Sequence, residues 1–281
     1  MIRIGLVQAA AVSDVPQNLK TICHFAHQAA AQECRALCFP EAFLTGYFPA
    51  QARELGLRAD FTAGCVSIPS DPAALSAAEY FQEISALACQ LKLDLLVGFM
   101  ERFQERCYLT HGIFTSGGQR FFYRKTHLGQ REQAVFSAGN ALDVYPLSCG
   151  LNVGISLCCE NHFPEVSQTL SLKGADIIFA PHASPRVSGN RKTVWARFIP
   201  ARSYDNRLYM ACCNQQDQER FGGGCLVTDP QGDVIASCFE EKPALICFDV
   251  DPKEVRRYRD PDSGMKYRYY PGLRRPELYE V

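Results

Sequence analysis

The sequence predicts an α/β fold in which two similar halves each contribute strands and helices to a sandwich. Short apolar runs typical of strands alternate with longer stretches of helical periodicity, and paired strands follow this alternation in both halves of the chain. Of the 281 residues, 47% are hydrophobic and 21% are charged, a composition that can bury a substantial core. Since no low-complexity linker interrupts the pattern, we expect a single domain over residues 1–281.

Each half is expected to contain three strands, two helices and a hairpin. In the first helix, Leu19, Ile22, Phe25 and Ala29 recur at the spacing that places them on one face. Each hairpin is indicated by a glycine-containing turn between two apolar runs. In the first half we expect strands at 4–8, 36–39 and 93–99, helices at 18–33 and 72–91, and a turn at 116–119. In the second half we expect strands at 153–157, 176–180 and 208–213, helices at 165–173 and 193–206, and a turn at 229–232.

The last thirty residues, 252–281, differ from the rest of the chain. They are rich in Arg, Tyr and Pro and show no regular hydrophobic period. We therefore expect an arm that packs on another surface, for which a second subunit is the candidate.

Charge and cysteine usage exclude several classes of protein. With 29 Lys and Arg against 30 Asp and Glu, the net charge of -1 lacks the basic excess of a dedicated nucleic-acid binder. No apolar run reaches the length of about eighteen residues that a membrane span needs. The first residues alternate like a strand and not like a signal peptide, so we expect a cytoplasmic location and no membrane partner. The 14 cysteines are spread along the chain without paired CxxC motifs, which favours reduced thiols and no zinc site.

Three segments carry residues suited to catalysis. Glu41 follows a buried apolar strand, where desolvation raises the pKa of a carboxyl group towards neutrality. Lys125 belongs to a group of cations that closes an aromatic strand. Cys158 lies between an apolar strand and a helix, where a thiol becomes exposed and its thiolate is favoured. Each residue alone also fits a structural role, as a satisfied strand-end carboxylate, a solvated strand end or a buried cysteine.

The order and flanks of these three residues resemble the Glu-Lys-Cys signature of the nitrilase superfamily of carbon–nitrogen hydrolases. The matching segments are FPEAFLTGY around Glu41, YRKTHL around Lys125 and GISLCCENHFPE around Cys158. Similar flanks extend the resemblance over nearly the whole chain, from IRIGLVQ at the start to RRPELY near the end. The resemblance implies an αββα sandwich that commonly dimerises into an αββα–αββα assembly. We therefore expect a homodimer or a higher even homo-oligomer.

The resemblance also implies a role for each residue. Cys158 would attack the substrate carbon and form a thioester-type intermediate, and Glu41 would move the protons. Lys125 would stabilise the oxyanion, with the backbone N–H of Cys159 as a second donor. Glu132 lies where the family often carries a second glutamate that positions the substrate and Lys125. Cys158 is chosen over Cys159 because counting back from Phe-Pro-Glu places it at the nucleophile position, and the mechanism requires no cofactor and no metal.

Candidate substrate-binding residues lie in the loops that flank these motifs. Tyr47 and His127 are two of them. Cys159 stands where the family usually has Tyr, Trp or Arg, and it leaves a smaller side chain beside the nucleophile. Arg186 or His182 is a candidate partner for a substrate carboxylate, since an Arg side chain matches that group with two parallel hydrogen bonds. The alternative is that Arg186 and His182 are surface or packing residues.

The subclass rests on finer features. Cys-Cys-Glu-Asn resembles true nitrilases, whereas Asn-His-Phe-Pro-Glu and RRPELY resemble the amidase and carbamoyl-amidase branches. The chain is shorter than typical nitrilases, so we expect an amidase that releases ammonia from a small amide or N-carbamoyl compound. A nitrilase and a catalytically silent binding protein of the same fold stay open as alternatives. The cysteine flank lacks the papain pattern, and the glycines at 222–224 lack the Lys-Ser/Thr of a phosphate-binding loop.

Overall fold

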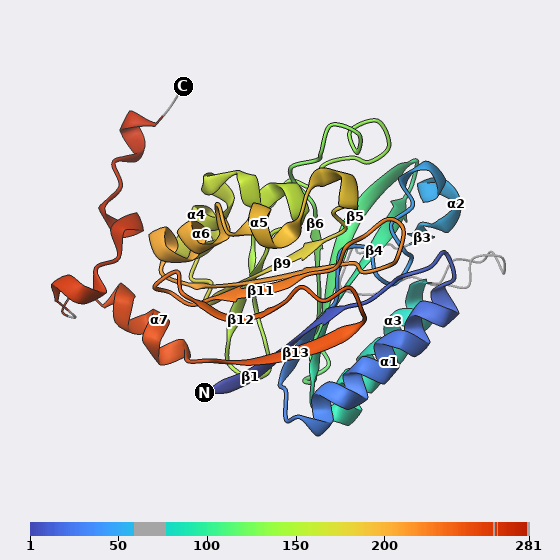
Figure 1. Cartoon of the computed structure of the whole chain (residues 1–281), viewed down its shortest axis with the longest axis horizontal. Coiled ribbons are helices and arrows are strands. Elements are labelled where there is room, and N and C mark those ends of the chain that lie inside the picture. Colours follow the sequence, from blue (N-terminus) through green and yellow to red (C-terminus); the bar gives the residue numbers. More distant parts are fainter. Residues whose placement is uncertain (59–76, 261, 263, 280–281) are drawn as a thin grey trace.

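Two mixed β-sheets lie face to face, and helices cover the outer side of each (Figure 1). The computed structural model describes residues 1–58, 77–260, 262 and 264–279. Figure 1 shows α1 and α3 on one side of the sandwich and α4, α5 and α6 on the other. The αββα sandwich predicted from the sequence is therefore confirmed.

The first sheet gathers strands from both ends of the chain. Its strands run in the order β13-β1-β2-β4-β5-β6, and β3 pairs with β4. Strands β1, β2 and β4 are parallel, whereas β13, β5 and β6 are antiparallel to their neighbours. The late strand β13 thus completes the sheet of the first half. The strands are β1 (Ile2–Gln8), β2 (Ala36–Cys38), β3 (Leu57–Arg58), β4 (Asp94–Phe103), β5 (Arg106–Phe114), β6 (Arg120–Arg124) and β13 (Ala244–Val250).

The second sheet has the order β12-β11-β10-β9-β8-β7. Its central strands β8, β9 and β10 are parallel, so their carboxyl ends lie at one edge of the sheet. Ligand sites of α/β folds commonly form beyond this edge. The strands are β7 (Val144–Pro146), β8 (Asn152–Ile155), β9 (Ile177–His182), β10 (Tyr209–Asn214), β11 (Cys225–Thr228) and β12 (Val234–Cys238).

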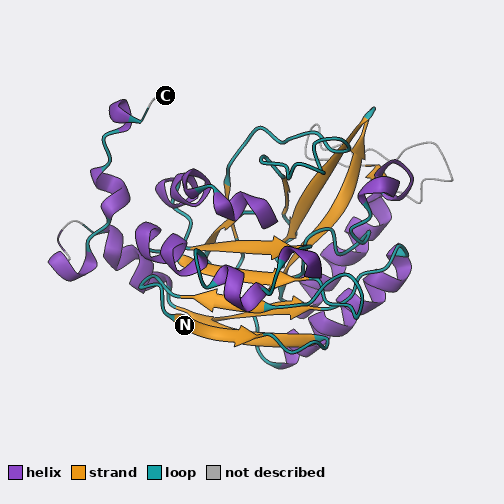
Figure 2. Ribbon diagram, turned by 45° about the horizontal axis from the view of Figure 1, so that its top comes forward, coloured by secondary structure: helices purple, strands orange, loops and turns teal. Residues whose placement is uncertain are grey.

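Helices and sheets form the layers that Figure 2 shows. Three groups of buried apolar side chains pack between these layers. Phe81 belongs to the group between the first sheet and its helices. Leu6 and Phe179 meet between the two sheets, and Trp195 and Met210 pack between the second sheet and its helices. The helices are α1 (Val15–Ala31), α2 (Ala52–Leu55), α3 (Ala77–Leu91), α4 (Pro164–Leu172), α5 (Arg191–Trp195), α6 (Ile199–Asn206) and α7 (Pro252–Arg259).

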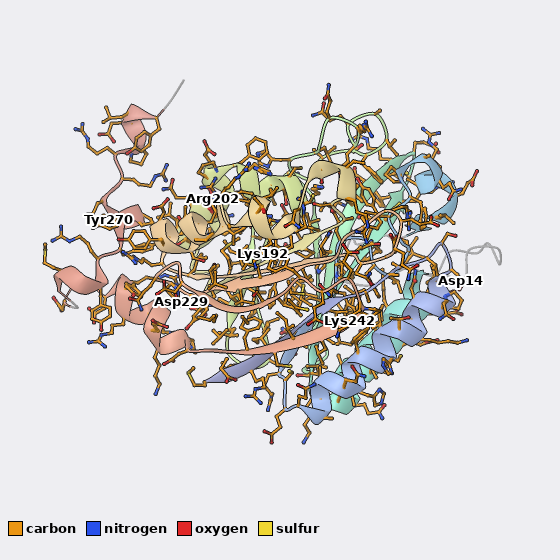
Figure 3. All side chains as sticks on the ribbon, viewed as in Figure 1. Asp14, Lys192, Arg202, Asp229, Lys242 and Tyr270 are labelled. Carbon is orange, nitrogen blue, oxygen red and sulfur yellow. The ribbon has the colours of Figure 1, made fainter. Side chains whose placement is uncertain are left out.

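Charged side chains lie on the outside of the sandwich. Asp14 at the start of α1, Lys192 in α5 and Lys242 before β13 are exposed and project outward (Figure 3). Asp14 also caps α1, because its side chain accepts a hydrogen bond from the backbone N–H of Gln17. None of the helices described by the structure is long and apolar enough to cross a membrane.

The structure corrects the prediction of one helix over 193–206. Helices α5 and α6 form instead, separated by a turn at 196–198. The break has a local cause: Pro200 lacks a backbone N–H, and α6 begins with Pro200 in its first turn after the non-helical Phe198. The prediction of a helix over 72–91 is met from Ala77 onward, and its first five residues lie outside the described residues.

The expected arm over 252–281 begins with helix α7. Asp251 caps helix α7, and only Val255 and Tyr258 of that helix are buried, which is too few to give a hydrophobic period. Beyond α7 the chain runs past α4 and α6 (Figure 1). There the hydroxyl groups of Tyr269 and Ser171 lie 2.7 Å apart, so this segment packs on its own chain.

Candidate active site

Cys158 occupies a strained turn at the end of β8. It begins a 3-10 helix over Cys158–His162, and its φ of 47° lies in the left-handed region that side chains other than glycine rarely adopt. The side-chain amide of Asn161 holds the turn by donating to the carbonyls of Ser156 and Cys158, each at 3.0 Å. The Cys158 Sγ lies 3.3 Å from the Ser184 Oγ, and the cysteine is partly exposed. The turn thus presents a thiol at the edge where the parallel strands end.

Lys125 lies directly after β6 and bridges two carboxylates. Its Nζ is 2.7 Å from Glu41 Oε1 and 2.9 Å from Glu132 Oε1. All three side chains are buried, at 1%, 1% and 6% exposure for Lys125, Glu41 and Glu132. Charges buried this deeply need partners, and here one ammonium group serves two carboxylates. The surplus negative charge means that one carboxyl group can hold a proton at little cost.

Burial and neighbouring charges shift the pKa values of this group in a consistent pattern. Burial, with the charge of Glu132, raises the pKa of Glu41 to about 7, and Lys125 opposes the rise. Burial and the charge of Glu41 raise the pKa of Cys158 to about 11, again against Lys125. Burial alone would lower the pKa of Lys125, but Glu41, Cys158 and Glu132 together raise it well above its usual value. Near neutral pH the thiol is therefore protonated, Lys125 is a cation, and Glu41 can accept a proton.

The structure joins Tyr47 to this network and places His127 and Cys159 beside the nucleophile turn. The Tyr47 hydroxyl donates to Glu132 Oε1 at 2.8 Å, and Glu132 Oε2 accepts from the Gly129 N–H at 2.7 Å. The Cys159 Sγ donates to the His127 carbonyl at 3.1 Å. The His127 ring is 40% exposed, and the carboxylate of Glu160, 3.9 Å from its Nδ1, raises its pKa. Four of the predicted site residues, Tyr47, Glu41, Lys125 and Glu132, thus share one set of hydrogen bonds.

His182 and Arg186 are placed differently, and in both cases the structure favours the packing alternative. His182 is buried at the end of β9, with its Nδ1 2.7 Å from the Ala180 carbonyl and its ring against Trp195. Burial lowers the pKa of His182 to about 3, so its ring is neutral. Arg186 forms two hydrogen bonds with the carboxylate of Glu241, at 2.8 and 3.2 Å. Neither side chain therefore offers an uncommitted positive charge to a substrate carboxylate.

Sequence reasoning missed Glu160, a fully buried carboxylate two residues after Cys158. Its Oε2 accepts from the Leu157 N–H at 2.6 Å. Its Oε1 accepts from the Tyr123 hydroxyl at 2.6 Å, the Thr126 N–H at 2.7 Å and the His127 N–H at 3.1 Å. Burial would raise the pKa of Glu160, but these hydrogen bonds lower it below its ordinary value. The available signal was an acidic residue directly behind the two cysteines at the end of an apolar strand.

The residues that hold Glu41 were also missed. The backbone N–H of Ala183 donates to Glu41 Oε2 at 3.0 Å, and the Gln215 side chain donates to the Glu41 carbonyl at 2.8 Å. Asn214 accepts from the Ser184 N–H at 2.8 Å. These residues come directly after β9 or at the end of β10, which is the edge where a ligand site is expected. These residues could have been predicted from their position at or just after the carboxyl ends of two strands.

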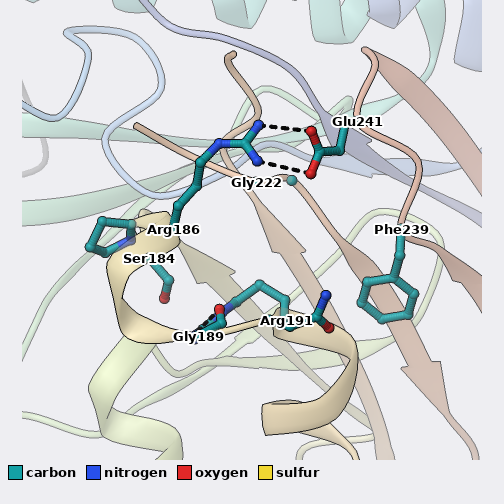
Figure 4. Close-up of a pocket in the computed structure, with 10 residues that line it drawn as sticks. Ser184, Arg186, Gly189, Arg191, Gly222, Phe239 and Glu241 are labelled. Atoms are coloured by element: carbon teal, nitrogen blue, oxygen red, sulfur yellow. Dashed lines mark hydrogen bonds and ion pairs between the residues drawn. The ribbon is translucent and has the colours of Figure 1, made fainter. Parts of the chain in front are cut away.

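A cavity of about 250 Å³ adjoins Cys158 through Ser184. Its lining includes Arg186, Arg191, Phe239 and Glu241. Figure 4 shows the Arg186–Glu241 pair at one end of the cavity, with Arg191 reaching towards Gly189 below Ser184.

Arg191 differs from Arg186 in its partners. Its guanidinium donates to the backbone carbonyls of Ser188 and Gly189, and no ion pair with a carboxylate is found for it within the described part of the chain. The pKa of Arg191 is lowered by burial and raised by Cys158, so the two residues lie within electrostatic reach. The cavity thus holds a half-buried cation for which the described residues provide carbonyl partners but no carboxylate. Across residues 1–58, 77–260, 262 and 264–279, no group of three or more His, Cys, Asp or Glu is arranged to hold a metal ion.

Comparison with known proteins identifies the family. The sequence model of the carbon–nitrogen hydrolases matches residues 3–260. The chain belongs to the carbon–nitrogen hydrolase family. As a carbon–nitrogen hydrolase it is an enzyme that acts on carbon–nitrogen bonds other than peptide bonds, as the sequence predicted.

Named relatives cover nearly the whole of this carbon–nitrogen hydrolase. A hydrolase in the pqqF 5' region of Pseudomonas protegens is 32% identical, over 95% of this chain and 86% of its own. Deaminated glutathione amidase from Homo sapiens is 28% identical, over 98% of this chain and 83% of its own. The solved NitN amidase of Nesterenkonia sp. AN1 superposes with a TM-score of 0.80 at 24% identity, over 99% of this chain and 98% of that one. At this identity the structural likeness shows the shared fold.

Proposed function

We propose that this carbon–nitrogen hydrolase cleaves the amide bond of a small amide or N-carbamoyl compound and releases ammonia through a thioester on Cys158. The observation that carries the proposal is the pairing of a protonated thiol with a buried carboxylate whose pKa is about 7, both within reach of the Lys125 ammonium. A base with this pKa can take the thiol proton near neutral pH and return it to a leaving amine. The names of the related amidases support the same reaction class.

The proposed reaction has two halves. Cys158 Sγ attacks the substrate carbonyl carbon while Glu41 takes the thiol proton, and Lys125 and the Cys159 N–H stabilise the oxyanion. Glu41 then gives the proton to the nitrogen, the carbon–nitrogen bond breaks, and ammonia leaves behind a thioester. In the second half Glu41 takes a proton from water, the resulting hydroxide attacks the thioester, and the proton returns to the Cys158 sulfur. The products are a carboxylic acid and the free enzyme.

Glu132 acts on this reaction through Lys125. It accepts hydrogen bonds from Lys125, Tyr47 and the Gly129 N–H, so it fixes the ammonium group in one direction. Its negative charge also raises the pKa of Glu41. We therefore assign Glu132 a positioning role, with Tyr47 holding Glu132 from the other side.

We further propose that the substrate is an amide that also carries an anionic group, and Arg191 is the residue that supports this proposal. Among the described residues the Arg191 guanidinium has carbonyl partners but no carboxylate, so its half-buried charge costs hydration energy that an anionic ligand would offset. Arg186 cannot serve in this way because Glu241 already neutralises it. A short chain between the amide and the anion would place the first at Cys158 and the second at Arg191.

An ammonia-release assay tests the proposed reaction. Wild type, Cys158→Ala and Cys159→Ala are compared on short amides, ω-amides of dicarboxylic acids, N-carbamoyl compounds and nitriles. We expect turnover of amides by wild type and Cys159→Ala and none by Cys158→Ala. Faster turnover of nitriles would instead identify a nitrilase.

Covalent labelling distinguishes an inactive protein from an unsuitable substrate panel. In a glutamate-to-leucine mutant of the Nesterenkonia amidase, the acetamide moiety of fluoroacetamide is covalently added to the active-site cysteine. We expect fluoroacetamide to label Cys158 before the other exposed thiols, as read by mass spectrometry. No turnover together with unselective labelling would support the catalytically silent alternative.

Two further expectations concern the assembly of the subunits and their location in the cell. We propose a homodimer or higher even homo-oligomer in the cytoplasm, with part of the segment after α7 at the subunit contact. Analytical ultracentrifugation of the full chain and of a chain ending at residue 264 measures the first of these. A monomer in both cases would contradict the assembly, whereas a dimer in both would contradict the role of the segment.

A further inference from the structure

Two thiols far apart in the sequence meet on the first sheet. The Sγ atoms of Cys34 and Cys247 lie 3.4 Å apart although 213 positions separate the residues. Cys34 is buried at 3% exposure, whereas Cys247 is partly exposed. Neither residue takes part in the hydrogen bonds around Lys125. The pair therefore has an accessible member, a protected member and no assigned role.

The strand register explains why the two sulfurs can approach. Cys247 pairs with Gly5 across the β1–β13 ladder, and Cys34 lies just before β2 on the other side of β1. The backbone N–H of Cys34 bonds to the Ala29 carbonyl, which fixes the end of α1 at this place. A Cβ at Gly5 would lie 3.6 Å from the Cys34 Sγ and 2.7 Å from the Leu37 side chain. The missing side chain at Gly5 thus leaves room for the sulfurs above the middle strand.

Cys34 and Arg3 favour the thiolate of Cys247, whereas the Gln32 Oε1, 3.3 Å from the Cys247 Sγ, favours the thiol because it accepts a hydrogen bond from it. The pKa of Cys247 is lowered to about 7, mainly by the hydrogen bond from Cys34 and further by the charge of Arg3, while burial and Asp249 oppose this. The pKa of Cys34 is raised by the same hydrogen bond and by burial, so Cys34 keeps its proton. A thiolate is the form that attacks peroxides and disulfides. The arrangement is that of an attacking and a resolving cysteine.

We propose that Cys34 and Cys247 form a redox-active pair that a peroxide converts into an intramolecular disulfide. The Cys247 thiolate attacks one oxygen of hydrogen peroxide, the O–O bond breaks, and a sulfenic acid and hydroxide form. The Cys34 sulfur then attacks the Cys247 sulfur, the S–O bond breaks, and the hydroxyl group leaves as water with the Cys34 proton. Together the two sulfurs lose two electrons, and the peroxide is reduced to one hydroxide and one water. The product ties the end of α1 to β13.

A second pair of cysteines provides a matched control. The thiols of Cys38 and Cys213 also interact, but both residues are fully buried between the two sheets. Proximity without access should leave this pair reduced in the folded protein. If only the Cys34–Cys247 pair is oxidised, closeness of two sulfurs is not sufficient and access to the peroxide is also required.

The experiment maps disulfides in the full chain after treatment with hydrogen peroxide. A Cys158→Ala background keeps the proposed nucleophile out of the reaction. Free thiols are alkylated with iodoacetamide after unfolding, and the chain is cleaved after glutamate and after arginine, which separates Cys34 from Cys23 at Glu33 and from Cys38 at Arg35. We expect a peptide of Cys34 linked to one of Cys247, lost on adding dithiothreitol, with Cys38 and Cys213 recovered alkylated.

Two variants and one further measurement keep the proposal testable. Cys34→Ser and Cys247→Ser should each abolish the linked peptide, and a rise in Tm on oxidation should occur only where both cysteines are present. Cys247 oxidised to sulfinic acid beside an alkylated Cys34 would overturn the proposal. Full alkylation of both residues at a peroxide dose that oxidises other exposed thiols would also overturn it. This result comes from the Cys158→Ala chain and therefore does not depend on whether the serine variants fold.

Discussion

The backbone N–H of Thr126 donates a 2.7 Å hydrogen bond to Oε1 of Glu160. Thr126 follows Lys125 directly, and Glu160 lies in the turn that begins with Cys158. One buried carboxylate therefore fastens the segment that carries the proposed oxyanion stabiliser to the turn that carries the proposed nucleophile. The positions of both depend on a residue that takes no part in the chemistry.

Replacing Glu160 by Gln should therefore lower both activity and stability. An amide has one acceptor oxygen, so its NH₂ group would face a donor such as the Leu157 N–H. Hydrogen bonds to charged groups contribute about 1.5–3 kcal/mol each, and we expect a loss of about 2–4 kcal/mol in unfolding free energy. We expect kcat to fall at least about tenfold with a smaller change in KM. Glu165→Gln, at an exposed residue of α4, is the control, and equal effects of both variants would refute the role of Glu160.

The pH dependence of kcat/KM should show the raised pKa of Glu41. Glu41 must be ionised to take the thiol proton, and its pKa is about 7. Activity should therefore rise about tenfold per pH unit below pH 7 and level off above it. Glu132→Gln should move this limb to lower pH, because the charge of Glu132 raises the pKa of Glu41. Ammonia release measured from about pH 5 to 9 gives both profiles; a rise that continues to the alkaline end would point to free thiolate instead.

The sequence predicted those parts of the site that local segments determine. Glu41, Lys125 and Cys158 each follow an apolar or aromatic strand, so the sequence already indicates that their side chains start at strand ends. Glu132 was predicted from the family resemblance, which implies a second glutamate in the loop after Lys125. These residues lie where the prediction put them, whereas their roles stay predictions.

His182 and Arg186 could not be placed from the sequence, because their orientation depends on distant elements. His182 lies under Trp195, and Arg186 meets Glu241 from the segment before β13. The same reason explains why Glu160 was missed, since its donors come from the segment after β6. The break between α5 and α6 was in principle readable from Pro200, but the apolar residues on both sides continued the helical pattern.

Removing the Tyr47 hydroxyl should reduce activity moderately. This hydroxyl donates to the Glu132 oxygen that also accepts from Lys125, and burial raises the pKa of Tyr47, so it stays a donor at all working pH values. A net hydrogen bond of about 1–1.5 kcal/mol corresponds to a five- to tenfold effect, and we expect Tyr47→Phe to lower kcat/KM by roughly this factor. Tyr145→Phe, whose hydroxyl makes only a 3.5 Å contact, should have wild-type kinetics. A wild-type rate for Tyr47→Phe would remove Tyr47 from the network that positions Lys125.

Arg191 should determine whether the enzyme prefers anionic amides. If its guanidinium binds the anionic group of the substrate, Arg191→Met should raise KM for an ω-amide of a dicarboxylic acid about 10- to 100-fold, the range of a charge-assisted hydrogen-bonded pair. KM for a neutral amide of the same length should stay within about twofold, because that substrate has no group for Arg191 to bind. The matched control is Arg186→Met, which removes a cation from the same cavity but one that Glu241 already neutralises. Equal changes in KM for the charged and the neutral amide would mean that Arg191 shapes the cavity without binding an anion, and the anionic substrate class would then have to be abandoned.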